Sequence, residues 1–147
     1  MTDNDNSKNE KRVGGVIISH GQLANELLSA AVTVVGDIPH ITAVSIGWHD
    51  DVEMARDQIK RAISTVDTGA GVLLLTDMFG GTPTNIAAMF LSKGEIEIVT
   101  GVNLPMVVKL ATATASITLE EIAQIVEEQG RSSIYRTGAI LEPKKNK

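Results

Sequence analysis

The chain has 147 residues, no cysteine and a net charge of −5 at pH 7, with 43% hydrophobic and 21% charged residues. This length suits one domain with its own core, and the missing cysteines exclude disulfides and thiolate metal ligands. The acidic balance argues against a nucleic-acid partner, and no apolar stretch approaches the ~20 residues of a membrane-spanning helix.

The first half of the chain alternates between predicted strands and helices. Residues 1–12 are polar and predict a disordered tail. The apolar run 13–19 predicts a buried strand. The leucine and alanine stripe over 22–35 predicts a helix, and the segment 41–46 predicts a second strand. Asp50 and Glu53 form a capping-box pair that predicts a helix to residue 66, followed by the most apolar strand, 71–76. Thr82 and Pro83 then predict a third helix to about residue 91.

The second half continues the alternation. Residues 96–100 predict a fourth strand, Asn103-Leu104-Pro105 opens a short helix, and Thr118 and Glu121 cap a fifth helix that Gly130 is expected to end. Residues 132–137 predict a last, more polar strand, and 138–147 a C-terminal tail. The repeated alternation predicts an α/β domain over residues 13–137, with an open, mostly parallel, doubly wound sheet.

Two chemically active side chains follow neighbouring strands of this predicted sheet. Strand one ends in Ser19-His20-Gly21, and Asp77 follows strand three. Ligands of an open parallel sheet bind at the carboxyl ends of strands, where the strand order reverses. With the strand order 2-1-3-4, His20 and Asp77 face each other across one crevice. A carboxylate that orients a histidine fixes its tautomer and stabilises positive charge on the ring.

The turn Gly80-Gly81-Thr82 leads from Asp77 into the third helix. Free backbone N–H groups and the dipole at a helix N-terminus favour phosphate binding. The other histidines fit less well, since His40 follows Pro39 in a turn and is expected to be solvated. No P-loop, dinucleotide fingerprint or His-Glu-x-x-His pattern is present, so we expect no metal and no organic cofactor.

Four segments together carry a family resemblance: VIISHGQLANELL, LLLTDMFGGTPTN, VTGVNLPMVVKL and the helix-rich C-terminal third. The chain resembles the IIA domain of the mannose/fructose/sorbose family of bacterial phosphotransferase systems over about residues 13–137. The resemblance implies a phosphotransferase with a phosphohistidine intermediate, in which Nε2 of His20 accepts the phosphoryl group from phospho-HPr. It further implies that Asp77 holds the other ring nitrogen and that Thr82 lies near the phosphate.

The resemblance also implies partners and a location. A separate IIB protein is the expected acceptor, and the membrane is reached only through IIC and IID components, which select the sugar. The family forms a homodimer in which a C-terminal antiparallel strand is exchanged, and residues 132–137 would be that strand. The cysteine-free chain fits the reducing cytoplasm, where we expect the protein.

Other functions stay open at this point. A second hypothesis is a regulatory phosphoprotein without sugar transport, and a third is a binding module for a small anion at the same crevice. An acceptor aspartate at Asp77 is a further alternative, but it needs a Mg²⁺ site with acidic residues after strand one. Since Ser19-His20-Gly21 has none, the residues favour His20 as the acceptor.

Overall fold

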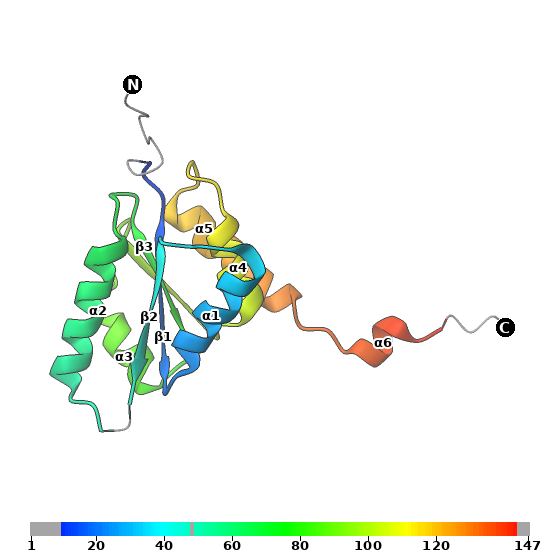
Figure 1. Cartoon of the computed structure of the whole chain (residues 1–147), viewed down its shortest axis with the longest axis horizontal. Helices are drawn as coiled ribbons and strands as arrows, with labels where there is room; N and C mark the ends of the chain where they lie inside the picture. The colour runs from blue at the N-terminus through cyan, green and yellow to red at the C-terminus, as the bar shows by residue number, and fades with distance from the viewer. Residues whose placement is uncertain (1–9, 48, 144–147) are drawn as a thin grey trace.

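The computed structural model describes residues 10–47 and 49–143, so residues 1–9 and 144–147 of the two predicted tails lie outside the description. The elements in chain order are β1 (Gly14–His20), α1 (Leu23–Val35), β2 (Ile41–Ile46), α2 (Val52–Val66), β3 (Val72–Thr76), α3 (Thr82–Ala88), β4 (Ile96–Thr100), α4 (Leu104–Thr112), α5 (Leu119–Ser132) and α6 (Thr137–Leu141). The four strands form one open parallel sheet in the order β2-β1-β3-β4 (Figure 1). The predicted class and strand order are confirmed.

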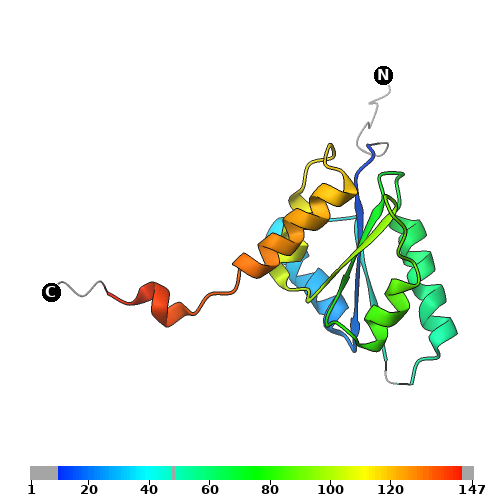
Figure 2. The same ribbon diagram turned by 180° about the vertical axis from the view of Figure 1, so that it is seen from behind.

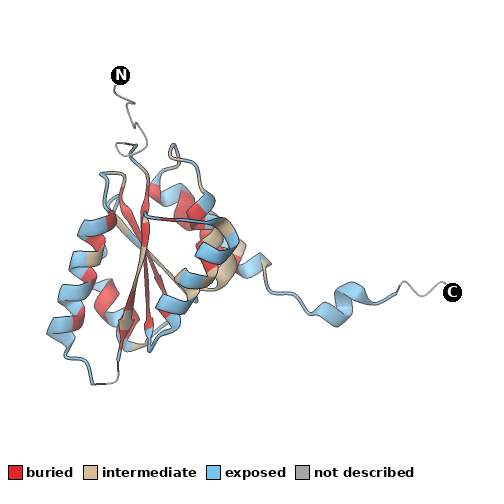
Figure 3. Ribbon diagram, in the orientation of Figure 1, coloured by how far each residue is buried: buried red, intermediate tan, exposed pale blue. Residues whose placement is uncertain are grey.

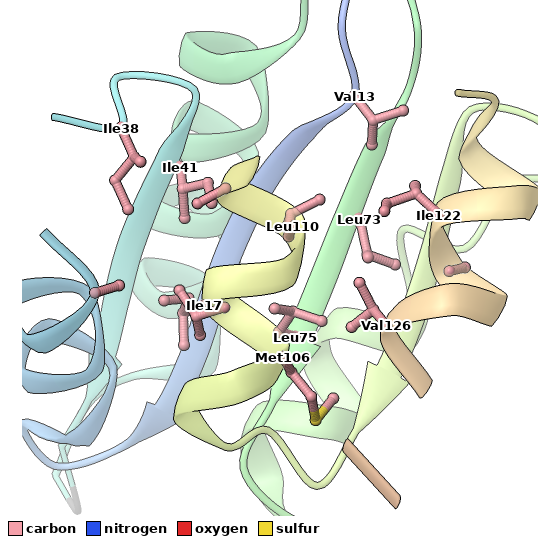
Figure 4. Packing of buried hydrophobic residues seen from close by; sticks show 14 of the residues in the cluster. Val13, Ile17, Ile38, Ile41, Leu73, Leu75, Met106, Leu110, Ile122 and Val126 are labelled. Carbon is pink, nitrogen blue, oxygen red and sulfur yellow. The ribbon is translucent and has the colours of Figure 1, made fainter. Parts of the chain in front are cut away.

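Helices cover both faces of the sheet. Helices α1, α4 and α5 lie on one face, and α2 and α3 lie on the other (Figures 1 and 2). Successive strand residues point to opposite faces, so Ile17 and Leu73 pack under α4 and α5 (Figure 4) while Val16 and Leu74 pack under α2. Burial on both faces explains why the central strands read as unbroken apolar runs (Figure 3).

The start of α2 and the end of α3 differ from the prediction. Asp51, not Asp50, is the N-cap of α2, and its side chain accepts the N–H of Glu53 at 3.3 Å. Asp50 instead accepts the N–H of Gly47 at 2.6 Å and closes the turn after β2. Helix α3 lies on the same face of the sheet as α2. It ends at Ala88, whereas the sequence predicted an end at about residue 91.

The prediction that Gly130 ends the fifth helix is wrong, because α5 continues to Ser132. Gly130 is buried, and a Cβ at this position would lie 2.5 Å from the sulfur of Met106 on α4. The missing side chain therefore allows α5 to lie close against α4. Tertiary packing, and not helix termination, explains the glycine.

The predicted strand over residues 132–137 is not formed in this chain. Ser132 is the last residue of α5 and Thr137 the first of α6, with no strand between them. Helix α6 projects away from the body of the molecule (Figure 1). It also spans the predicted boundary between the domain and the C-terminal tail. Exchange of this segment with a second copy stays a prediction.

Within residues 10–47 and 49–143, no helix combines the length and the apolar character needed to cross a bilayer.

Candidate functional site

The strand register brings the candidate site residues to one edge of the sheet. Ile18 in β1 lies beside Thr76 in β3. His20 is the last residue of β1 and Asp77 the first after β3, so both leave the sheet at its carboxyl edge, the lower edge in Figure 1.

His20 and Asp77 are joined by two hydrogen bonds to one carboxylate oxygen. Oδ2 of Asp77 lies 2.7 Å from Nδ1 of His20 and accepts the backbone N–H of His20 at 2.9 Å. Oδ1 accepts the N–H of Met78 at 2.9 Å. The His20 side chain is 43% exposed and that of Asp77 only 11%, so the carboxylate lies beneath a ring that solvent can reach.

The pKa of Asp77 is lowered by these contacts. Burial on its own raises the pKa of this carboxyl. The backbone and ring hydrogen bonds from His20, the positive charge of the His20 ring in its protonated form and the N–H of Met78 outweigh burial and hold the pKa of Asp77 below its usual value of 3.8. An ionised carboxylate can only accept, so the ring proton sits on Nδ1 and the lone pair of Nε2 is left free.

The turn after Asp77 packs against the ring. A Cβ on Gly81 would lie 2.8 Å from Cε1 and 3.3 Å from Nε2 of His20, so only glycine leaves room for the imidazole here. Gly80 has a φ of +82°, in the left-handed region that favours glycine. The two glycines therefore have different roles. Gly80 allows the backbone conformation of the turn, and Gly81 leaves space for the ring of His20.

A cavity of about 400 Å³ lies over this turn. Its lining includes four of the five candidate residues from the sequence: His20, Gly80, Gly81 and Thr82. Asp77, the fifth candidate, does not line the cavity but is hydrogen-bonded to His20, which does. Asp50 and Asn85 also line it, and sequence patterns did not single them out for the site. Asp50 follows β2, the strand next to β1. Its position at the end of a strand that neighbours β1 could therefore have indicated that it lies near His20.

Two buried hydroxyls support the site and were not predicted. Ser19 accepts the N–H of Ala24 at 2.6 Å and so caps α1, whose N-cap residue Gln22 makes no side-chain cap. Thr84 on α3 bonds to the carbonyl oxygen of Met78 at 2.5 Å. The signal for Ser19 was its place at the end of β1, shortly before a predicted helix, since serine is a favoured capping residue.

His40 lies away from this edge, and its predicted solvation is wrong. Both ring nitrogens are buried, and neither meets a hydrogen-bond partner in the described part of the chain, although the carbonyls of Leu110 and Ala111 lie near. Burial, and to a lesser degree the charge of Arg12, lowers the pKa of His40. His49, by contrast, is exposed in the turn before α2.

Comparisons with known proteins bear on the same region. A family model described as PTS system fructose IIA component matches residues 14–127, which include His20 and Asp77. The fructose-specific EIIA component of Bacillus subtilis strain 168 is 24% identical over 128 residues, which cover 86% of this chain and 88% of that protein. The mannose-specific EIIAB component of Escherichia coli strain K12 is 29% identical over 121 residues, which cover 81% of this chain. The chain spans only 38% of that protein's length.

A solved structure shares the fold. The PTS IIA protein associated with the fucose utilization operon of Streptococcus pneumoniae superposes with a TM-score of 0.76 and is 28% identical. The superposition covers 90% of this chain and 98% of the other. The likeness thus extends over the whole sheet and its helices.

Proposed function

Since the chain belongs to the PTS fructose IIA component family, we propose that it is a phosphocarrier of a sugar phosphotransferase system. In this proposal Nε2 of His20 accepts a phosphoryl group from phospho-HPr and passes it to a separate IIB protein. The observation that carries the proposal is the 2.7 Å hydrogen bond between Nδ1 of His20 and Asp77, because it leaves Nε2 as the nucleophile.

The proposed step exchanges one nitrogen–phosphorus bond for another. The Nε2 lone pair forms a bond to phosphorus while the bond from phosphorus to the donor's histidine breaks, and its electron pair returns to the donor ring. Charge spreads over the three equatorial oxygens, so positioning and electrostatics supply the catalysis. Phosphorylated His20 retains the Nδ1 proton and carries positive charge on the ring, which the Asp77 carboxylate stabilises.

Gly80, Gly81 and Thr82 are the proposed phosphate-binding residues. They line the cavity together with His20, and the start of α3 has no side-chain cap that would compete for its N–H groups. Pro83 has no N–H, so the backbone of the turn and the exposed Thr82 hydroxyl are the donors within reach of the cavity. The proposal involves no metal and no organic cofactor.

The surface beside His20 suits the docking of the two partner proteins. Leu23, Met78 and Phe79 are exposed near the site, and Phe79 is 86% exposed on the same turn that follows Asp77. Exposed aromatic and large apolar side chains are typical of the central part of protein interfaces. We propose that phospho-HPr and IIB use this surface in turn. We further propose that the reaction takes place in the cytoplasm and that contact with the membrane is left to IIC and IID components.

A homodimer is part of the same proposal. β4 is an edge strand, and the segment after α5 exposes Ile134, Tyr135, Ile140 and Leu141. An edge strand with unpaired N–H and C=O groups accepts a further strand readily. We propose that the segment 132–137 adopts the predicted antiparallel pairing only on β4 of a second copy.

Phosphorylation with purified components tests the proposal. The chain is incubated with enzyme I, HPr and phosphoenolpyruvate in EDTA, and its intact mass is measured. We expect one phosphoryl group that is lost in acid and survives base, that is absent from His20→Ala and that persists in the matched control His49→Ala. Label retained by His20→Ala, or stripped by base and spared by acid, contradicts the assignment.

Adding a IIB protein separates the transport role from its alternative. Transfer of the label from the chain to IIB supports a carrier in sugar uptake. Label that stays on the chain in the presence of IIB proteins supports the regulatory phosphoprotein instead.

A further inference from the structure

Three threonine hydroxyls form a chain beneath the candidate site. Oγ1 of Thr100 on β4 lies 2.9 Å from Oγ1 of Thr76 on β3, which lies 2.9 Å from Oγ1 of Thr84 on α3. Thr84 in turn contacts the carbonyl oxygen of Met78 at 2.5 Å. The hydroxyls therefore connect two strands and a helix to the turn that follows Asp77.

The Thr84 hydroxyl is the donor that reaches the turn. It lies within bonding distance of two acceptors, the carbonyl oxygen of Met78 at 2.5 Å and Oγ1 of Thr76 at 2.9 Å. Its single proton can make one full hydrogen bond, and the carbonyl, which can only accept, is the nearer of the two partners. Thr76 in turn donates to Oγ1 of Thr100.

The bond made by Thr84 is unusual for a threonine in a helix. Such hydroxyls commonly bond to a carbonyl three or four residues earlier in the same helix, as Thr112 does with Val108 in α4. Thr84 instead reaches Met78, six residues back and outside α3. Its hydroxyl thus holds the loop and not its own helix.

Met78 is consequently held at both of its backbone groups. Its carbonyl accepts from Thr84, and its N–H donates to Oδ1 of Asp77. With Oδ1 occupied in this way, Oδ2 is left for the ring and backbone of His20. A movement of Met78 would move the carboxylate that orients the histidine.

We propose that Thr84 is a positioning residue for phosphoryl transfer: its hydroxyl fixes the backbone of Met78, which in turn fixes the Asp77 carboxylate against Nδ1 of His20. This inference rests on the proposed function for its effect on transfer. Its structural half, the effect of Thr84 on the ring of His20, is independent of that function.

The test compares Thr84→Val and Thr84→Ser with Thr112→Val, which removes a threonine hydroxyl bonded only within its helix. We expect Thr84→Val to lower kcat for transfer from phospho-HPr by roughly three- to tenfold, the effect of losing about one hydrogen bond. The KM for phospho-HPr should change less than kcat, because the buried Thr84 side chain cannot itself contact a partner protein. Thr84→Ser should restore kcat, and Thr112→Val should leave it unchanged.

Nitrogen NMR of the His20 ring supplies the second readout. In Thr84→Val the ring should lose part of its Nδ1-protonated tautomer, and Thr84→Ser should keep the wild-type spectrum. If Thr84→Val does not fold, Thr84→Ala against Thr84→Ser isolates the hydroxyl at nearly equal volume. Wild-type kcat together with an unchanged ring spectrum in a folded variant lacking the hydroxyl overturns the proposal.

The two proposals fail in different ways. If the wild-type chain takes no label from phospho-HPr, the phosphocarrier function is wrong, and the ring spectrum still reports whether Thr84 positions His20. If the wild-type chain is labelled and the variants lacking the hydroxyl match it in both readouts, only the role of Thr84 is wrong.

Discussion

The ring of His20 rests against the backbone of Gly81, so closely that a Cβ there would lie 2.8 Å from Cε1. The φ of Gly81 is −83°, a value open to any residue. A glycine is therefore needed at this position to leave space for the imidazole, and not to allow the conformation of the turn.

Gly81→Ala tests this relationship. The added methyl group should push the ring away from Asp77, and a displacement of about 1 Å at a reacting group can lower a rate by roughly tenfold to hundredfold. We expect that loss in phosphoryl uptake from phospho-HPr, with little change in urea unfolding. Gly138→Ala is the matched control, because nothing lies within 4 Å of a Cβ there. Uptake at the wild-type rate in Gly81→Ala would show that the ring has room to spare.

Asp77→Asn keeps the shape of the side chain and removes its charge. Without the carboxylate, neither the Nδ1-protonated tautomer nor the positive charge on the phosphorylated ring is stabilised. We expect a loss of roughly tenfold or more in transfer from phospho-HPr, with an unchanged circular dichroism spectrum. Asp57→Asn, an equal charge change on the exposed face of α2, is the control. If both variants transfer equally fast, Asp77 has no part in the mechanism.

His40 predicts a pH dependence of stability. Its pKa is lowered in the folded chain from the ordinary 6.5 by burial and by the charge of Arg12. The unfolded chain therefore binds a proton at a higher pH than the folded chain does. The free energy of unfolding should have its full value above pH 6.5 and fall as the pH is lowered through 6.5 toward the folded pKa.

Urea unfolding between about pH 5 and pH 7.5 measures this slope. His40→Asn should flatten the slope below pH 6.5, whatever it does to stability at neutral pH. An identical slope in both proteins would mean that His40 titrates alike in the folded and unfolded chains.

The segment after α5 predicts the oligomeric state. A chain ending at Ser132 should be monomeric by light scattering at micromolar concentration, where we expect the full chain to be a dimer. Ile134→Asp should weaken the dimer, because Ile134 is exposed in the single chain at the proposed contact. Val34→Asp introduces the same charge at an exposed valine on α1 and should leave the dimer intact. A monomeric full chain excludes the exchanged strand.

Local patterns were sufficient for the sheet and for the placement of the His20–Asp77 pair. The central strands are covered on both faces, so their apolar runs are unambiguous, and polar residues at their ends fall at the edge where ligands bind. The strand order then brings β1 next to β3 and so His20 next to Asp77.

Features that depend on residues distant in sequence were missed. Gly130 resembled a helix stop, because the close contact with Met106 that requires a glycine there comes from another helix. His40 resembled a solvated turn residue because the end of α4, near Leu110, covers its ring. The bond from Thr84 to Met78 depends on a turn that Gly80 makes possible with its φ of +82°. None of these contacts repeats with the period of a helix or a strand.

The carboxylate of Asp50 lies in the wall of the cavity that His20 opens into. In the proposed function, a phosphoryl group on Nε2 brings about two further negative charges into that cavity, and like charges in a partly enclosed space raise each other's free energy. Repulsion from Asp50 would oppose the stabilisation that Asp77 and the turn at Gly80–Thr82 give the phosphorylated form, and would raise the transfer potential of the phosphoramidate. An electrostatic arrangement of this kind favours departure of the phosphoryl group over its storage.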